Sequence, residues 1–113
     1  MHEASLMESA LDIAVEHARR NSAARIVRMT LGVGVLSGVD PRALEIAFAE
    51  VVCGTIAEGA TLSIESQSGD CCCKRCECRF ATTELLPSCP ECDGTDISIL
   101  SGQDLQLLSL EVA

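Results

Sequence analysis

Two Cys-x-x-Cys pairs constrain the fold of this chain more than any other feature. The first pair is Cys73 and Cys76, and the second is Cys89 and Cys92. A two-residue gap lets both sulfurs of one turn reach a single ion, and two such turns face to face supply four thiolates in a tetrahedron. A cysteine-rich module of about 30 residues has too small a hydrophobic core to fold without a bound ion. The pattern therefore predicts a structural zinc ribbon with no open coordination position.

Other interpretations of the cysteines remain open. Four thiolates also suit iron, so a rubredoxin-like electron carrier is an alternative. Cys71, Cys72 and Cys78 flank the first pair, and Cys76 with Cys78 could offer another ligand set. The matching spacing of the two pairs favours Cys73 and Cys76. The residues after the pairs, at positions 77 and 93, stand where zinc ribbons often carry glycine at positive φ.

The composition excludes several classes of function. The 113 residues suit one domain, or one domain with a small insert. A net charge of −9 opposes binding to phosphate backbones, and two Phe without Trp or Tyr give no base-stacking platform. We find no apolar run of about 18 residues and no signal-peptide pattern, so we expect no membrane contact and a cytoplasmic location. Cytoplasmic thiols stay reduced, which favours metal binding over disulfides.

Helical signals mark two segments. Ser5 followed by Glu8 is a capping-box pattern and predicts a helix over residues 5–20. His17, on the edge of its apolar face, is interpreted as an ordinary helix residue. Asp40-Pro41 predicts the start of a second helix, with Asp as N-cap and Pro at the first helical position.

The second helix is expected to end near Gly54, and Cys53 at its end is interpreted as a small buried hydrophobe. Residues 25–36 alternate and predict a strand with one buried face. Another strand should follow Gly59. Polar residues 66–70 predict a turn before the cysteine-rich stretch.

A final strand ends the chain, with Leu108, Leu110 and Val112 alternating. It is too short to be stable alone, so it should pair with the sheet of the first domain. The cysteine-rich stretch would then be an insert and not a tail.

The chain opens with Met1-His2-Glu3, which can form a compact chelate. The α-amine, the deprotonated amide nitrogen of His2 and its Nδ1 can close fused rings around one metal ion. Nitrogen and oxygen donors in a flat arrangement suit Ni(II) or Cu(II) better than Mg or Ca. Many N-termini are frayed and without function, so the motif alone does not identify a ligand.

Together these features resemble the HypA/HybF family of nickel metallochaperones, which supply nickel during maturation of [NiFe] hydrogenase. The resemblance covers essentially the whole chain. The segments that carry it are Met1-His2-Glu3 with Ser5-Leu6, Gly34-x-Leu36-Ser37, Pro41-x-Ala43-Leu44, Gly54-Thr55-x-Ala57-Glu58-Gly59-Ala60, Cys89-Pro90-x-Cys92 and Ser101-Gly102-x-Asp104-Leu105.

The resemblance implies an α+β fold, with a three-stranded sheet and two helices and an inserted zinc-ribbon-like module. Residues 1–69 and 101–113 would form the nickel-binding domain, and residues 70–100 the zinc-binding domain. Nickel would bind Met1 and His2, with Glu3 and Asp40 contributing or supporting. Zinc would bind four thiolates, those of Cys73, Cys76, Cys89 and Cys92.

The resemblance also implies partners: the nickel-inserting GTPase HypB and the hydrogenase large-subunit precursor. In some organisms the family also serves urease. We expect a carrier that is a monomer or a weak homodimer and not an enzyme, because no nucleophile–base pair or open metal site appears. His2 and His17 are the only histidines, so none lies beside the predicted zinc. The alternative is a zinc-ribbon adaptor that transports no metal.

Overall fold

The computed structural model describes residues 2–113, which form two compact units. The helix unit comprises the residues up to Gly32, Val39–Glu65 and Gln106–Ala113. The cysteine unit comprises Val33–Gly38 and Ser66–Leu105. Among the described residues, no helix combines the length and the apolar character that crossing a membrane requires.

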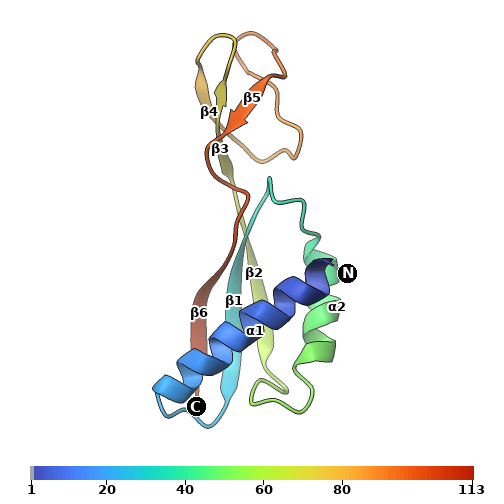
Figure 1. Ribbon diagram of the computed structural model, residues 1–113, viewed down its shortest axis with the longest axis vertical. Helices are drawn as coiled ribbons and strands as arrows, with labels where there is room; N and C mark the ends of the chain where they lie inside the picture. The colour runs from blue at the N-terminus through green and yellow to red at the C-terminus, as the bar shows by residue number, and fades with distance from the viewer. Residues whose placement is uncertain (1) are drawn as a thin grey trace. The chain divides into compact units, whose positions relative to one another are not determined.

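The helix unit has a three-stranded sheet of order β2-β1-β6. Its elements are α1 (His2–Arg20), β1 (Ile26–Gly34), α2 (Pro41–Val51), β2 (Thr61–Gln67) and β6 (Leu105–Val112). The two helices pack on each other, and α1 lies across the strands (Figure 1). The predicted α+β fold is confirmed, and the last strand joins β1 as expected.

The first helix begins at His2, so the predicted start at Ser5 is wrong. Nothing before Ser5 stops a helix, since Ala4 is a strong helix former and neither Gly nor Pro precedes it. The carboxylate of Glu3 accepts a hydrogen bond from its own backbone N–H and stands at the positive end of the helix. Glu3 therefore supplies an acidic side chain to the first turn of α1.

The core of the helix unit is mainly aliphatic, with Phe48 of α2 also buried in it. Met29 and Leu31 of β1 are fully buried, as is Leu44 of α2. The buried stripe of α1 comprises Met7, Ala10, Leu11, Ala14 and Ala18. Each large aliphatic side chain buried in this way contributes roughly 1.5–3 kcal/mol relative to exposure.

The second helix begins as predicted. Asp40 is its N-cap, with Oδ1 accepting from the N–H of Arg42 at 3.0 Å, and Pro41 occupies the first helical position. The burial predicted for Cys53 is wrong, because this residue is exposed. The buried face of the segment ends with Val52, and Cys53 lies one residue off it, its Sγ 3.4 Å from the carbonyl of Ala49.

The cysteine unit holds a second sheet of order β4-β3-β5. Its strands are β3 (Gly69–Cys73), β4 (Arg79–Thr82) and β5 (Ile97–Ile99), and both neighbours run antiparallel to β3. The turn predicted over residues 66–70 is wrong, since the chain is extended there, with β2 ending at Gln67 and β3 starting at Gly69 after a single intervening residue.

Close backbone packing explains this extended path. The N–H of Val35 donates to the carbonyl of Gln67 at 2.9 Å, and a Cβ on Gly69 would lie 2.2 Å from Leu36 Cδ1. A Cβ on Gly34 would lie 2.0 Å from the carbonyl oxygen of Gly102. Only glycine fits such approaches. The polar composition of residues 66–70 suggested a turn because the sequence alone does not reveal these backbone contacts.

Candidate metal centres

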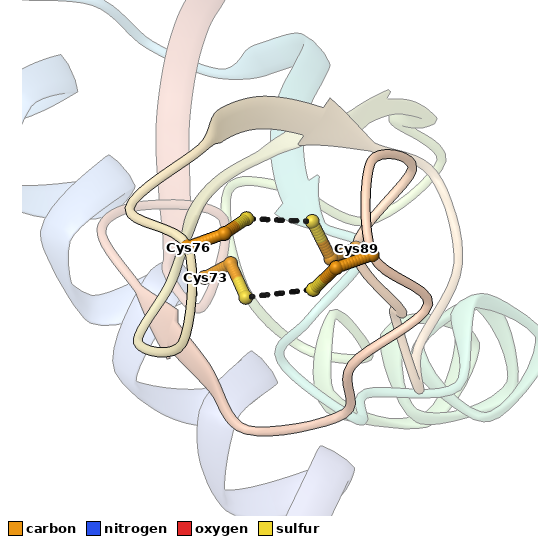
Figure 2. Close-up of side chains that lie close together, drawn as sticks. Cys73, Cys76 and Cys89 are labelled. Atoms are coloured by element: carbon orange, nitrogen blue, oxygen red, sulfur yellow. Dashed lines mark hydrogen bonds between the residues drawn. The ribbon is translucent and has the colours of Figure 1, made fainter.

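The cysteine unit brings four thiols together. The sulfurs of Cys73, Cys76, Cys89 and Cys92 all lie within 4.8 Å of one another. Two of the separations are 3.6 Å, from Cys73 to Cys92, and 3.5 Å, from Cys76 to Cys89 (Figure 2). Sulfurs bound tetrahedrally to one zinc ion at about 2.3 Å are about 3.8 Å apart. Both the donor set and the spacing therefore fit one tetrahedral ion.

Two turns of the same construction supply these thiols: the first cysteine turn (residues 73–78) and the second cysteine turn (residues 89–94). In the first, the N–H of residue 77 donates to the carbonyl of Cys73 at 2.8 Å, and the N–H of Cys73 donates to that of Cys78 at 2.9 Å. In the second, the N–H of residue 93 donates to Cys89 at 2.9 Å, and the N–H of Cys89 donates to Gly94 at 2.8 Å.

Both turns contain the left-handed residue that their sequences suggested. Glu77 has φ of 63° and Asp93 has φ of 58°. A left-handed residue other than glycine costs roughly 1–2 kcal/mol. Structural zinc contributes on the order of 10–16 kcal/mol of apparent binding free energy, so a bound ion would outweigh both costs. Glu77 is therefore no obstacle to a site that includes the first turn.

Backbone N–H groups favour negative charge on particular sulfurs. Burial would raise the pKa of Cys89, but the N–H groups of Cys92 and Glu91 and the neighbouring thiols lower that pKa to about 7. The N–H of Glu91 lies 3.4 Å from this sulfur. The N–H of Cys78 acts to lower the pKa of Cys76, but hydrogen bonding with Cys89 and burial outweigh it and raise the pKa to about 12. The backbone N–H groups of the second cysteine turn therefore favour the thiolate form of Cys89.

The other cysteines of this unit lie outside the four-thiol cluster. Cys71 is buried and opposite Phe80, and burial raises the pKa of its thiol. Cys72 and Cys78 are half-buried. The structure thus gathers the four cysteines that the matched spacing selected.

A second cluster lies in the helix unit, where the first turn of α1 meets the start of α2. His2 is exposed and Glu3 is half-buried in this turn. The backbone N–H of Asp40 donates to Oε2 of Glu3 at 3.3 Å. The contact joins positions far apart in sequence, so no spacing rule could have found it. Met1, also predicted as a ligand, lies outside the described residues.

Electrostatics keep this cluster acidic. The N–H groups of Glu3 itself and of Asp40 lower the pKa of the Glu3 carboxyl below its ordinary 4.5. Oε2 of Glu3 accepts from the N–H of Asp40, and Oδ1 of Asp40 accepts from the N–H of Arg42. His17 is exposed and lies fifteen residues along α1 from His2, a rise of about 22 Å, so it cannot join this cluster.

Fold and sites together define a small metal-binding α+β protein with a zinc-type Cys₄ module. The family described as "Hydrogenase/urease nickel incorporation, metallochaperone, hypA" matches residues 1–112. The chain belongs to this family, as the resemblance of its motifs indicated.

Relatives match along nearly their whole length. The hydrogenase maturation factor HypA of Picosynechococcus sp. is 42% identical over 112 residues, covering 99% of both chains. The protein of the same name from Rhizobium leguminosarum bv. viciae is 40% identical with the same coverage. The solution structure of the Ni metallochaperone HypA from Helicobacter pylori is 28% identical, with a TM-score of 0.69, covering 97% of this chain and 96% of that one.

Proposed function

We propose that this chain is a nickel carrier that binds Ni(II) at its N-terminus and delivers it for maturation of [NiFe] hydrogenase. The ligands would be the amine of Met1 and the amide and imidazole of His2, with Glu3 and Asp40 contributing or supporting. The observation that carries the proposal is the contact between Asp40 N–H and Glu3 Oε2, which brings residue 40 beside the N-terminal motif. Membership of a nickel-incorporation family gives independent support.

The start of α1 suits such a chelate. The first N–H groups of a helix have no intrahelical partner, so helix formation leaves the His2 amide available. The positive helix end disfavours a cation, and the carboxylates of Glu3 and Asp40 offset this effect. Nitrogen donors favour nickel over Mg and Ca. Because His2 is exposed, a partner can approach and take the ion by ligand exchange.

We further propose that the four-thiol cluster holds a structural zinc ion through Cys73, Cys76, Cys89 and Cys92. Bound zinc would supply the folding energy that this small module lacks. The backbone N–H groups that face the sulfurs of Cys73 and Cys89 would stabilise the negative charge of these two thiolates. Residues 1–69 and 101–113 would then bind nickel, and residues 70–100 would bind zinc.

The proposed partners are HypB and the hydrogenase large-subunit precursor, with urease as a possible second client and the cytoplasm as the location. The names of the relatives, which are hydrogenase maturation factors, support the first client.

Nickel titration of untagged, zinc-loaded protein tests the proposal. His2→Ala removes the imidazole donor, so we expect nickel affinity to fall by more than about 100-fold, beyond the 10–100-fold typical of outer-shell changes. Zinc content should not change. His17→Ala is the matched control, since it removes an exposed histidine of the same helix, and it should bind nickel as the wild type does. Equal nickel affinity in wild type and His2→Ala would refute N-terminal binding.

A further inference from the structure

Cys78 lies beside the four-thiol cluster although it is not one of its four members. The ladder of β3 and β4 pairs Cys71 with Phe80 and Cys72 with Arg79, so the next pair is Cys73 with Cys78. The hydrogen bond from Cys73 N–H to the Cys78 carbonyl, 2.9 Å, continues this register. Directly opposed residues of antiparallel strands have side chains on the same face, with Cβ atoms about 4.5–5.5 Å apart. The Cys78 side chain therefore lies on the face of Cys73.

The second cysteine turn shows how close this position is to the sulfurs. Its residue equivalent to Cys78 is Gly94, whose carbonyl accepts from Cys89 N–H just as Cys78 accepts from Cys73. A Cβ on Gly94 would lie 3.2 Å from the sulfur of Cys92 and 3.7 Å from that of Cys73. Because the two turns repeat the same hydrogen bonds, we expect the Cβ of Cys78 to lie near the sulfurs of Cys76 and Cys89, although the Cys78 sulfur itself lies 3.7 Å from the carbonyl oxygen of Arg79.

The four members of the cluster are not equally enclosed. Cys73 and Cys89 are fully buried and Cys92 is half-buried, whereas Cys76 is exposed. Water and competing ligands reach Cys76 first. It is the ligand that the protein encloses least, and it belongs to the turn that also carries Cys78.

We propose that Cys78 is a reserve zinc ligand that takes the place of Cys76 when Cys76 is released. The inference rests on the zinc role proposed above. In the exchange, the Cys78 thiol gives its proton to solvent as its sulfur binds, and Cys76 takes up a proton as its sulfur leaves. The ion keeps four thiolates and the net charge of the site does not change. The second turn has Gly94 at the equivalent position and therefore no reserve.

Cys72 provides a matched control. It is half-buried like Cys78 and adjacent to Cys73 in sequence. Successive residues of a strand point to opposite faces, so its side chain lies on the other face of β3 from Cys73. Its sulfur lies 3.8 Å from the carbonyl of Cys73. Loss of Cys72 should leave the exchange intact.

The test is to count thiolate ligands in full-length variants reconstituted with Co(II), from the sulfur-to-metal charge-transfer intensity, alongside zinc affinity by chelator competition. Cys76→Ser should keep four thiolates and lose less than about tenfold in zinc affinity. Cys92→Ser should show three thiolates and lose more than about 100-fold, the scale expected for a lost ligand. Cys76→Ser/Cys78→Ser should behave like Cys92→Ser, and Cys76→Ser/Cys72→Ser like Cys76→Ser.

Three thiolates bound to the metal in Cys76→Ser would overturn the inference. This single variant tests the inference even if a double variant fails to fold. Equal loss in the two double variants would overturn it as well. A wild type that binds no zinc would refute the zinc proposal itself, whereas a zinc-binding wild type with a three-thiolate Cys76→Ser refutes only the reserve role.

Discussion

The four-thiol cluster and the N-terminal cluster are built in opposite ways. The thiols come from two short turns of the same construction, and backbone hydrogen bonds hold each turn closed. In the N-terminal cluster, a hydrogen bond of 3.3 Å links the first turn of α1 to the start of α2, and His2 is exposed. The first arrangement is local and enclosed, and the second is long-range and open.

Under the proposed function, this difference would let one small chain hold one metal and pass on another. A resident ion needs ligands that stay in place without it, and the hydrogen bonds of the cysteine turns would keep the thiols in place. A transferred ion needs ligands that a partner can reach, and the exposed start of α1 would meet that need.

The largest effect is expected from Cys89→Ser, which removes the buried thiol of lowered pKa from the enclosed cluster. Zinc affinity should fall by more than about 1,000-fold, a little over 4 kcal/mol of the 10–16 kcal/mol typical of structural zinc. Amide hydrogen exchange should then show lost protection in β3 and β5 and retained protection in α1. Equal loss of protection in α1 would show that the two regions do not fold separately.

An intermediate effect is expected from pH. Nickel displaces protons from the amine, the amide and the imidazole, so affinity should fall by more than about 100-fold from about pH 8 to about pH 6. The lowered pKa of Glu3 keeps its carboxylate charged throughout this range. Its contact with Asp40 is stabilising above pH 4.5 and is lost only as the pH falls through the lowered pKa, below the nickel transition. Competition titrations at several pH values measure the slope, and a flat profile would contradict nitrogen ligation.

The smallest effect separates the two roles of Asp40. Asp40→Asn keeps a good N-cap, so stability should change by only a few tenths of a kcal/mol, whereas Asp40→Ala should cost about 1 kcal/mol. Both remove the charge, whose attraction for a divalent ion at about 4 Å in water is about 2 kcal/mol, or about 30-fold in nickel affinity. Chemical denaturation and nickel titration of both variants check this. Unchanged nickel affinity in both variants would show that Asp40 serves only as the N-cap of α2.

The sequence predicted the four-thiol cluster better than the N-terminal cluster, for a physical reason. A Cys-x-x-Cys turn is a local structure, so spacing alone selected the four thiols that lie together, and the residues at positive φ followed from position. The contact between Glu3 and Asp40 depends on how two helices pack, which no local pattern encodes.

The wrong predictions have the same origin. The extended path through residues 66–70 depends on the approach of Gly69 to Leu36, a tertiary contact. The exposure of Cys53 depends on which residue of the α2 stripe is last, a boundary that periodicity fixes only to within a residue or two. The predicted start of α1 at Ser5 followed from the good capping properties of serine. The helix begins at His2 instead, so Ser5 lies inside it.

X-ray absorption at the nickel edge of zinc-loaded, untagged protein carrying one equivalent of Ni(II) tests the central claim most directly. The account predicts a first shell of nitrogen and oxygen only, with an imidazole signature that disappears in His2→Ala, and zinc that remains surrounded by sulfur. Nickel–sulfur scattering in the wild type, with zinc displaced from its thiolates, would contradict it.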